Sequence, residues 1–215
     1  MLVPFSWQKT NRNLQAAITS SIAAGDFWAR SRGLKYLRFV HRLDAETSGV
    51  LLFAKSPGAL QTYSQLFETR KMEKRYLAVV AGIPKQAEWI CRLKLAPDPD
   101  RIGRMRADAR KGKEAETHFR CLESRAGIPP ARARSLVEAR PFTGRTHQIR
   151  VHLASSGHPV LGDAMYGSGA SKEGLALRAV ELAYKDPFTR RQVLIVAPVD
   201  QFLYVHGFKG SGDAL

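Results

Sequence analysis

The sequence has few cysteines and no long apolar run. Its two cysteines, Cys91 and Cys121, do not form a C-x-x-C pair, so neither a disulfide framework nor a zinc knuckle is indicated. We interpret both as small buried residues of a protein in a reducing cytoplasm. No apolar run could span a bilayer, and the N-terminal MLVPFSWQKTNRN lacks the basic segment and apolar run of a signal peptide. We therefore expect a cytoplasmic protein without a membrane partner.

Acidic residues are also few. The 215 residues include 19 Asp and Glu against 34 Lys and Arg, which gives a net charge of +15. Solubility does not need an excess of this size, and a folded protein this basic usually meets a polyanion. Nucleic acid is favoured over a membrane surface because no basic amphipathic helix stands out. With 44% hydrophobic residues, the chain can also build a real core.

Strand patterns outnumber helix patterns. Apolar runs predict strands at 36–40, 50–56, 75–83, 88–95, 117–123 and 135–141. Helices are predicted at 14–24 and at 56–71, the second with Ser56 as N-cap and Pro57 at its first position. This order predicts an α+β protein with a mixed, mainly antiparallel central sheet flanked by helices and loops, in a single domain over 1–215.

Residues 96–113, APDPDRIGRMRADARKGK, combine basic residues with Pro and Gly. The composition predicts a loop or a loose hairpin. A solvated connection and an RNA-contacting arm are both compatible with it.

The stretch HRLDAETSG, residues 41–49, collects polar groups between two of the predicted strands. Connections at strand ends are places where a rigid scaffold presents chemistry. Taken alone, Asp44 is typical of a turn carboxylate that accepts hydrogen bonds from its own backbone.

A second cluster, GRTHQIRVHL, begins at residue 144. Thr146 is expected to cap a helix and Gly157 to end it. His147 and His152 are five residues apart, whereas zinc-binding helices use i, i+4 spacing. A metal site, and with it a metal-dependent hydrolase, is therefore not indicated. Nor does the sequence contain a P-loop, a G-x-G-x-x-G motif or a G-x-S-x-G elbow.

These clusters together resemble one family. HRLDAETSG is similar to the H-R-L-D-x-x-T-S-G motif of the RluA-type RNA pseudouridine synthases. RYLAVVAG at 75–82, GKEAETHF at 112–119, GRTHQIRVHLASSGHPVLGDAMYG at 144–167 and LALRAVELAYKDP at 175–187 resemble its later motifs, in the same order. The resemblance implies the pseudouridine synthase fold with an RNA-binding cleft. It also implies a cofactor-free, monomeric enzyme that converts uridine to pseudouridine in structured RNA, with large-subunit rRNA as the expected substrate and tRNA as the alternative.

The resemblance also implies roles for catalytic residues. Asp44 would act at C1′ of the flipped uridine, either as a nucleophile or by stabilising positive charge, as carboxylates do in glycosidases. Arg150 would pair with Asp44, which would lower the pKa of that carboxyl. Tyr76 would stack on the base and assist removal of the C5 proton; without the family it would be a half-buried strand tyrosine.

Other residues are expected to bind RNA. Arg42 would enter the space that the flipped base leaves or hold the flanking phosphate. Arg145 and His147, near a helix N-terminus, are candidates for phosphate contacts, and Ile149 would wall the uracil pocket. Thr47 and Ser48 are expected to fix the loop conformation.

The sequence also departs from the family. The expected N-K-P-x-G segment before HRLD is not found, and no S4-like RNA-binding module precedes the catalytic domain. Arg178 stands where the family usually has histidine, and Ala45 where a basic residue is frequent. The rival hypothesis is a non-catalytic RNA-binding protein that retains the fold.

Overall fold

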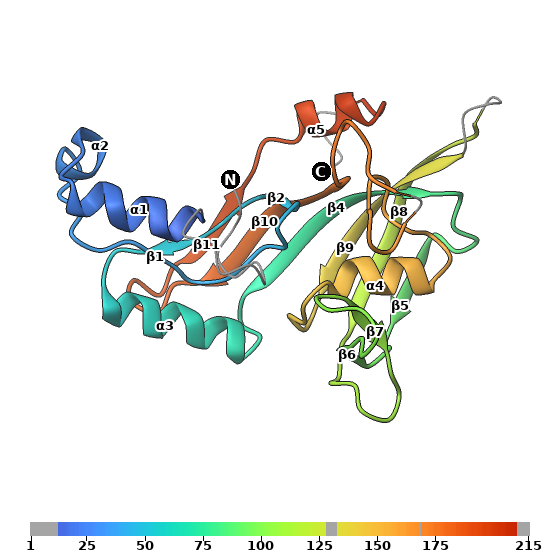
Figure 1. Ribbon diagram of the computed structural model, residues 1–215, viewed down its shortest axis with the longest axis horizontal. Coiled ribbons are helices and arrows are strands. Elements are labelled where there is room, and N and C mark those ends of the chain that lie inside the picture. The colour runs from blue at the N-terminus through green and yellow to red at the C-terminus, as the bar shows by residue number, and fades with distance from the viewer. Residues whose placement is uncertain (1–12, 128–132, 168, 210–215) are drawn as a thin grey trace. The chain divides into compact units, whose positions relative to one another are not determined.

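The computed structural model describes residues 13–127, 133–167 and 169–209 (Figure 1). Residues 1–12 of the N-terminal stretch discussed above lie outside the described residues. The described helices are α1 Leu14–Ala23, α2 Phe27–Arg30, α3 Pro57–Glu68, α4 Gln148–Ser155 and α5 Asp200–Val205. The described strands are β1 Arg38–Phe39, β2 Ser48–Gly49, β3 Phe53–Ala54, β4 Glu73–Ala81, β5 Glu88–Cys91, β6 Leu95–Pro97, β7 Met105–Ala107, β8 Thr117–Arg125, β9 Arg134–Pro141, β10 Leu177–Lys185 and β11 Gln192–Val196.

The chain divides into two compact units. The α3 unit comprises residues 1–46, 51–72 and 184–193, and the sheet unit comprises residues 47–50, 73–183 and 194–215. The assignment of one catalytic domain to the whole chain stays a prediction. None of the helices in the described ranges has the length and apolar character that crossing a bilayer requires.

The main sheet has the strand order β11-β10-β4-β9-β8-β5, with β2 added on β10. Its long strands β10, β4, β9, β8 and β5 pair in antiparallel fashion, whereas β2 runs parallel to β10. The α+β class with a mixed, mainly antiparallel sheet is thus confirmed. The predicted strand 88–95 ends early, because β5 stops at Cys91 and Leu95 begins β6. β6 pairs with β7, so part of 96–113 forms a hairpin.

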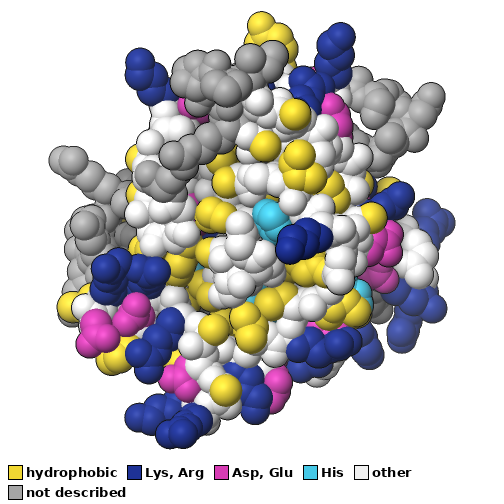
Figure 2. Space-filling view, turned by 90° about the vertical axis from the view of Figure 1, so that its right-hand side faces the viewer, with side chains coloured by type: hydrophobic (Ala, Val, Ile, Leu, Met, Phe, Trp, Pro, Cys, Tyr) yellow, Lys and Arg dark blue, Asp and Glu magenta, His cyan; other side chains and the backbone are white. Residues whose placement is uncertain are grey.

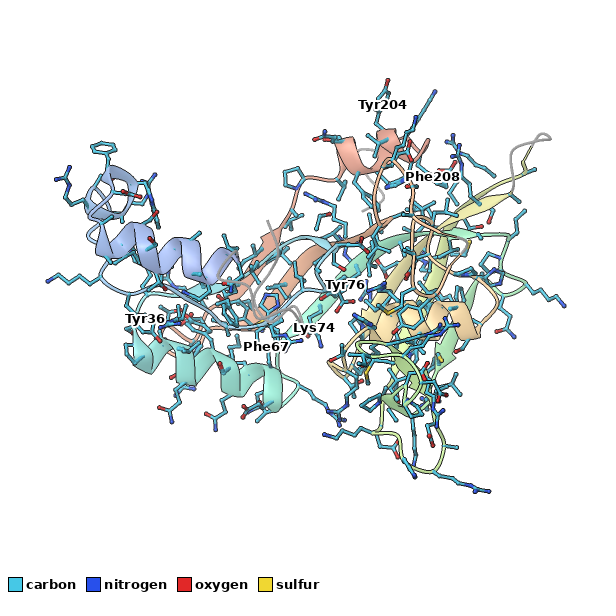
Figure 3. The ribbon with its side chains drawn as sticks, in the orientation of Figure 1. Tyr36, Phe67, Lys74, Tyr76, Tyr204 and Phe208 are labelled. Carbon is cyan, nitrogen blue, oxygen red and sulfur yellow. The ribbon has the colours of Figure 1, made fainter. Side chains whose placement is uncertain are left out.

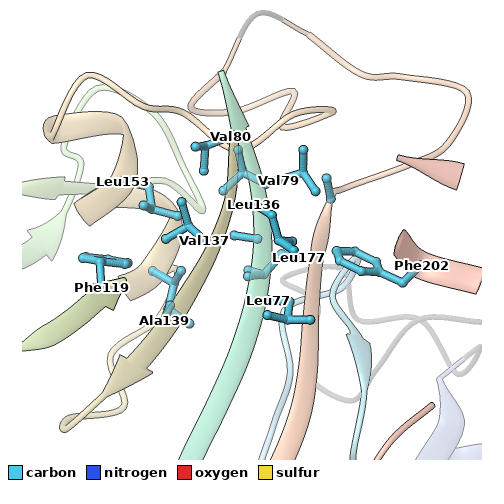
Figure 4. Packing of buried hydrophobic residues seen from close by; sticks show 14 of the residues in the cluster. Leu77, Val79, Val80, Phe119, Leu136, Val137, Ala139, Leu153, Leu177 and Phe202 are labelled. Atoms are coloured by element: carbon cyan, nitrogen blue, oxygen red, sulfur yellow. The ribbon is translucent and has the colours of Figure 1, made fainter. Parts of the chain in front are cut away.

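The core lies on both faces of β4. Leu77 and Val79 point to one face and Val80 to the other, because strand side chains alternate, and none of the three is exposed. In Figure 4, Phe202 of α5 packs on the side of Leu77, and Leu153 of α4 on the opposite side. The uninterrupted apolar run of β4 is therefore that of a strand covered on both faces.

The two cysteines differ in burial. Both are free thiols, and Cys91 is buried as expected. Cys121 is only partly buried, so that expectation was wrong for it. The ladder of β8 with β9 is irregular between Cys121 and Glu123, and the Cys121 thiol lies 3.3 Å from the Ser124 hydroxyl.

In the α3 unit, helix α3 begins where the sequence predicts. The Ser56 side chain accepts a hydrogen bond from the Ala59 N–H at 3.2 Å, and Pro57 occupies the first turn, where its missing N–H costs nothing. Tyr63, in the middle of α3, donates a 2.6 Å hydrogen bond to Asp186. This bond fixes the turn that contains Asp186 against the helix.

The strands predicted at 36–40 and 50–56 shrink to two residues each, β1 and β3. Beside β1, Gln15 of α1 donates to the Leu37 carbonyl at 2.9 Å and accepts from the Phe39 N–H at 3.4 Å. The Val40 N–H donates to the Leu52 carbonyl, and backbone groups alternate along a strand, so Gln15 binds the edge of β1 that faces away from β3.

Two glycines give a matched prediction about stability. Gly49 has φ +119, and a Cβ there would lie 2.0 Å from the Ala179 carbonyl oxygen, whereas a Cβ on Gly58 of α3 would meet nothing. Gly49→Ala should lower the free energy of unfolding by about 1–3 kcal/mol through overpacking. Gly58→Ala should raise it by roughly 0.5–1 kcal/mol, because alanine loses less backbone entropy in a helix. Urea unfolding measures both, and an unchanged midpoint for Gly49→Ala would contradict the tight pairing of β2 with β10.

Candidate active site

Arg150 lies on α4 of the sheet unit and is 4% exposed. Its Nε donates to one carboxylate oxygen of Asp163 at 2.7 Å, and an Nη donates to the other at 2.8 Å. Asp163 also accepts from the backbone N–H groups of Met165 and Tyr166. Burial alone would raise the pKa of Asp163, but these hydrogen bonds outweigh burial and lower it. The bidentate pair fixes the plane of the Arg150 guanidinium.

Tyr166 extends this network. Its ring lies 5.1 Å from the guanidinium carbon of Arg150 and 5.2 Å from that of Arg104. Its hydroxyl accepts from the Met105 N–H at 2.8 Å and lies 2.8 Å from Nδ1 of His147. Burial raises the pKa of Tyr166 to about 12, so the phenol stays protonated at neutral pH. The hydroxyl therefore joins the Met105 backbone and the His147 ring in one hydrogen-bonded group.

The N-cap of α4 is His147 and not Thr146, so that expectation was wrong. His147 has φ 54 and makes no side-chain capping bond. The side chain of Gln148 binds the residues before the helix. Its Oε1 accepts a hydrogen bond from the backbone N–H of Arg145 at 3.0 Å and another from the Thr143 hydroxyl at 2.6 Å. A buried glutamine thus holds the segment that enters the helix.

Arg145 and His147 lie together in this short segment before α4, as the sequence predicts. Arg145 Nε donates to the Glu114 carbonyl at 2.9 Å, and both side chains are partly buried. At the other end of the helix, Gly157 has φ +84, the left-handed conformation expected where a helix stops.

Ile149 and Tyr76 share one core. Ile149 is 7% exposed within the main apolar cluster, and Tyr76 packs against that cluster from β4. Lys74 is two residues before Tyr76 on β4, which puts both side chains on one face of the strand (Figure 3). Lys74 Nζ donates to the Thr143 carbonyl at 3.0 Å. Sequence reasoning missed Lys74, although strand alternation from Tyr76 could have indicated it.

The remaining histidines are held by the sheet unit. His152 is fully buried; its Nε2 lies 3.0 Å from the Leu93 carbonyl oxygen and its Nδ1 3.0 Å from the Thr117 hydroxyl. Burial lowers its pKa, which favours the neutral ring. Nδ1 of His158 lies 3.1 Å from the Ala81 carbonyl oxygen. Hydrogen bonding to the scaffold accounts for these side chains.

Asp44 and Arg42 lie in a loop of the α3 unit, directly before residues 47–50 of the sheet unit in the chain. The residues on either side of Arg42 anchor this loop. The His41 ring stacks on Phe67 with 4.7 Å between ring centroids, and Leu43 is buried. Arg42 is exposed and Asp44 partly buried. The pairing of Asp44 with Arg150 stays a prediction, because the two residues belong to separately described units.

The end of the same motif lies in the sheet unit. Ser48 and Gly49 pair with β10, and the Ser48 hydroxyl accepts a 3.1 Å hydrogen bond from Arg178. Arg178 also donates to the Pro198 carbonyl at 3.0 Å. Arg178 thus joins Ser48 to the segment after β11; that Ser48 fixes the loop conformation stays a prediction.

Figure 2 shows one face, on which many Lys and Arg side chains, with some Asp and Glu, lie toward the margin and another basic side chain lies beside a histidine among hydrophobic side chains near the middle.

Comparisons with known proteins agree on one family. Residues 23–155 match the family model described as RNA pseudouridylate synthase. The ribosomal large subunit pseudouridine synthase C of Salmonella typhimurium is 36% identical over 188 residues, which cover 79% of this chain and 54% of that protein. The chain thus spans about half the length of the curated relatives it matches.

Solved structures are also similar. Human RNA pseudouridylate synthase domain containing 1 aligns with a TM-score of 0.67 and 30% identity, covering 79% of this chain and 71% of that chain. Human RNA pseudouridylate synthase domain containing 4 aligns with a TM-score of 0.68 and 24% identity, covering 88% and 81%, respectively. The second likeness supports the fold alone.

Proposed function

Because the chain belongs to the RNA pseudouridylate synthase family, we propose that it is an isomerase that converts uridine to pseudouridine in RNA. One observation carries the proposal. The region that matches the family, residues 23–155, contains a carboxylate, a tyrosine and an arginine at the motif positions Asp44, Tyr76 and Arg150. A protein that only binds RNA has no chemical need for a carboxylate beside its phosphate path, where it repels the ligand.

The reaction breaks the bond between C1′ and N1, turns the base and forms a bond between C1′ and C5. N1 gains a proton, and the C5 proton is lost. Asp44 acts at C1′, either by attacking it or by stabilising the positive charge that develops there. Arg150 supplies a cation for the Asp44 carboxylate, and the Asp163 pair supports this role by fixing the guanidinium. Tyr76 stacks on the uracil and assists removal of the C5 proton.

The target uridine must leave its stack, which costs a few kcal/mol. Contacts to the RNA offset this cost. Arg42 fills the vacated space or holds the flanking phosphate, Arg145 and His147 bind phosphate, and Ile149 walls the pocket. The chain needs no cofactor for this chemistry.

The substrate is large-subunit rRNA, with tRNA as the alternative. The name of one relative supports this choice, since the Salmonella typhimurium protein is called ribosomal large subunit pseudouridine synthase C. The basic β6–β7 hairpin is then a candidate RNA arm. We place the enzyme in the cytoplasm as a monomer; its free cysteines suit a reducing compartment.

The direct test uses rRNA and tRNA labelled with tritium at uridine C5. The purified protein should release tritium from one pool, because isomerisation displaces the C5 proton. RNA binding should weaken steeply with salt through counterion release. Binding without release from either pool would favour the non-catalytic hypothesis, and a flat salt response would contradict the polyanion interpretation.

A further inference from the structure

We infer that Arg104 of the β6–β7 hairpin is a further phosphate contact for RNA, and that Tyr166 is the positioning residue that holds it beside His147. The ligand is the phosphodiester backbone of RNA. The inference deepens the proposed function and rests on RNA being the substrate. All the residues that carry it belong to the sheet unit.

The ring of Tyr166 brings together two basic residues that lie far apart in the chain. The guanidinium carbon of Arg104 lies 5.2 Å from the centroid of this ring, and the centroid of the His147 ring lies 5.6 Å from it. Arg104 comes from the turn between β6 and β7, and His147 is the N-cap of α4. Two side chains of types that bind phosphate are therefore neighbours around one aromatic ring.

Hydrogen bonds of Tyr166 fix the same arrangement. Its hydroxyl accepts from the N–H of Met105, the residue after Arg104, at 2.8 Å and lies 2.8 Å from Nδ1 of His147. Its own backbone N–H donates to Asp163 at 3.0 Å. The hairpin and the start of α4 are thus both tied to one side chain that is itself anchored, so a change at this tyrosine alters the position of one relative to the other.

The apolar support between the hairpin and α4 is small. Its buried residues are Leu95 of β6, Ala115 and Val151 of α4, with Met105 and Tyr166 packed against them (Figure 1). Three buried side chains fix an orientation less strictly than the main core fixes the long strands. The directional hydrogen bonds of Tyr166 therefore carry much of the alignment of the hairpin on the helix.

The Arg104 guanidinium has donors to offer to a ligand. Its side chain is 28% exposed, and its nitrogen lies 3.7 Å from a carboxylate oxygen of Asp98, which is beyond hydrogen-bond range. Among the residues that the structure describes, no acceptor takes a hydrogen bond from this side chain. A guanidinium carries five N–H donors in a planar fork that matches two oxygens of a phosphate. A phosphodiester group would therefore satisfy donors that the fold leaves available.

The other charges of the hairpin turn are engaged. Arg106, two residues further along, is 44% exposed, but it donates to Asp108 at 3.1 Å. A phosphate would have to displace that carboxylate. Asp98 is 14% exposed and accepts from the Asp100 N–H at 3.1 Å, so it is held in the turn. Arg104 is therefore the better phosphate ligand of the two arginines, although Arg106 is the more exposed.

The segment before α4 is attached to the hairpin a second time. The Arg145 Nε donates to the Glu114 carbonyl at 2.9 Å, and the preceding residue, Lys113, exchanges two backbone hydrogen bonds with Leu95 of β6. Arg145 and His147, the two candidate phosphate ligands of this segment, are thus both linked to the hairpin. RNA that binds them passes beside it.

The test compares Arg104→Gln with Arg106→Gln, because both variants remove one positive charge from the same hairpin. Binding of a fluorescent RNA stem-loop is measured by anisotropy over a series of KCl concentrations. Arg104→Gln should make the slope of log affinity against log salt shallower by about 1, the value for one phosphate contact. Arg106→Gln should leave the slope unchanged. Arg104→Lys should keep it as well, because the charge stays in place.

Tyr166→Phe tests the positioning role without a change in charge. The variant keeps the ring and removes the hydroxyl, so RNA affinity should fall about threefold to tenfold, the scale of a lost hydrogen bond. Arg104→Gln should then cost less affinity in the Tyr166→Phe background than in the wild type, because the two residues act through one contact. Tyr63→Phe is the control, since its hydroxyl bonds to Asp186 instead, and it should bind RNA as the wild type does.

An unchanged slope in Arg104→Gln, or an equal change in Arg106→Gln, would overturn the inference, and additive losses in the double variant would overturn the role of Tyr166. The wild-type chain gives a test that needs no variant. Saturating RNA should slow the modification of Arg104 by phenylglyoxal, as read by mass spectrometry, and an unchanged rate would contradict the phosphate contact. Because binding is measured apart from turnover, absent tritium release with a shallower slope in Arg104→Gln would count against the proposed function alone.

Discussion

Asp44→Asn should lower tritium release from uridine-labelled RNA by about 10⁴-fold or more, the scale of removing a catalytic carboxylate. The variant keeps the shape of the side chain and removes the negative charge that the proposed mechanism uses at C1′. Its affinity for RNA should be unchanged or slightly higher, because a carboxylate near phosphates repels them. Single-turnover tritium release and filter binding on the same RNA measure the two effects.

Glu46→Gln is the matched control for this result. Glu46 is an exposed carboxylate two residues further along the same loop, so the change in net charge is the same. Its turnover should stay close to that of the wild type. Equal losses in both variants would point to a general effect of charge, and a large loss of RNA binding in Asp44→Asn would argue against a catalytic role for Asp44.

Local patterns predicted the elements whose causes are local. Helix α3 begins after Ser56 because the cap and Pro57 lie next to one another, and Gly157 marks the end of α4 because the left-handed conformation favours glycine. The positions of strands β4, β8 and β9 along the chain could be predicted for the same reason, whereas their order in the sheet, β4-β9-β8, could not. Each has its own run of apolar residues.

Long-range side-chain contacts could not be predicted in this way. Gln15 binds the backbone of β1 from a helix more than twenty residues away, and Gln148 of α4 donates to the Glu116 carbonyl, 32 residues earlier in the chain. The partner of Arg150 is the clearest case. Asp163 lies in a late motif that the sequence shows, but only the fold brings it to the guanidinium.

The motif comparison had a similar limit. It predicted that Ser48 fixes the loop and noted Arg178 as a departure, but no pattern indicated that these two observations are one contact. In this chain Arg178 joins Ser48 to the Pro198 carbonyl. The positions of Asp44, Tyr76 and Arg150 as a catalytic group stay predictions that the variants test.

Asp163→Asn should lower the free energy of unfolding by about 3–5 kcal/mol, the range for removing one partner of a buried ion pair. The Asp163 side chain is fully buried and that of Arg150 is 5% exposed. Asparagine would turn an amide donor toward a guanidinium donor and leave the charge without its partner. Urea unfolding monitored by tryptophan fluorescence at neutral pH measures the loss.

The acid dependence follows from the sign of the pKa shift. The pKa of Asp163 is lower in the folded chain than in the unfolded chain, so the pair stabilises the fold above the unfolded value of about 3.9. That stability is lost as pH falls through the lower folded pKa. Asp163→Asn should therefore lose less stability than the wild type on acidification.

Arg150→Met combined with Asp163→Leu separates stability from chemistry. Replacing both partners by apolar side chains removes the unpaired charge, so most of the stability lost in Asp163→Asn should return. Turnover should remain lost, because the proposed mechanism requires the Arg150 guanidinium. A double variant as unstable as Asp163→Asn would show that the hydrogen bonds that Asp163 accepts from the backbone N–H groups of Met165 and Tyr166, rather than charge pairing, hold this part of the fold. A stable double variant with normal turnover would remove Arg150 from the mechanism.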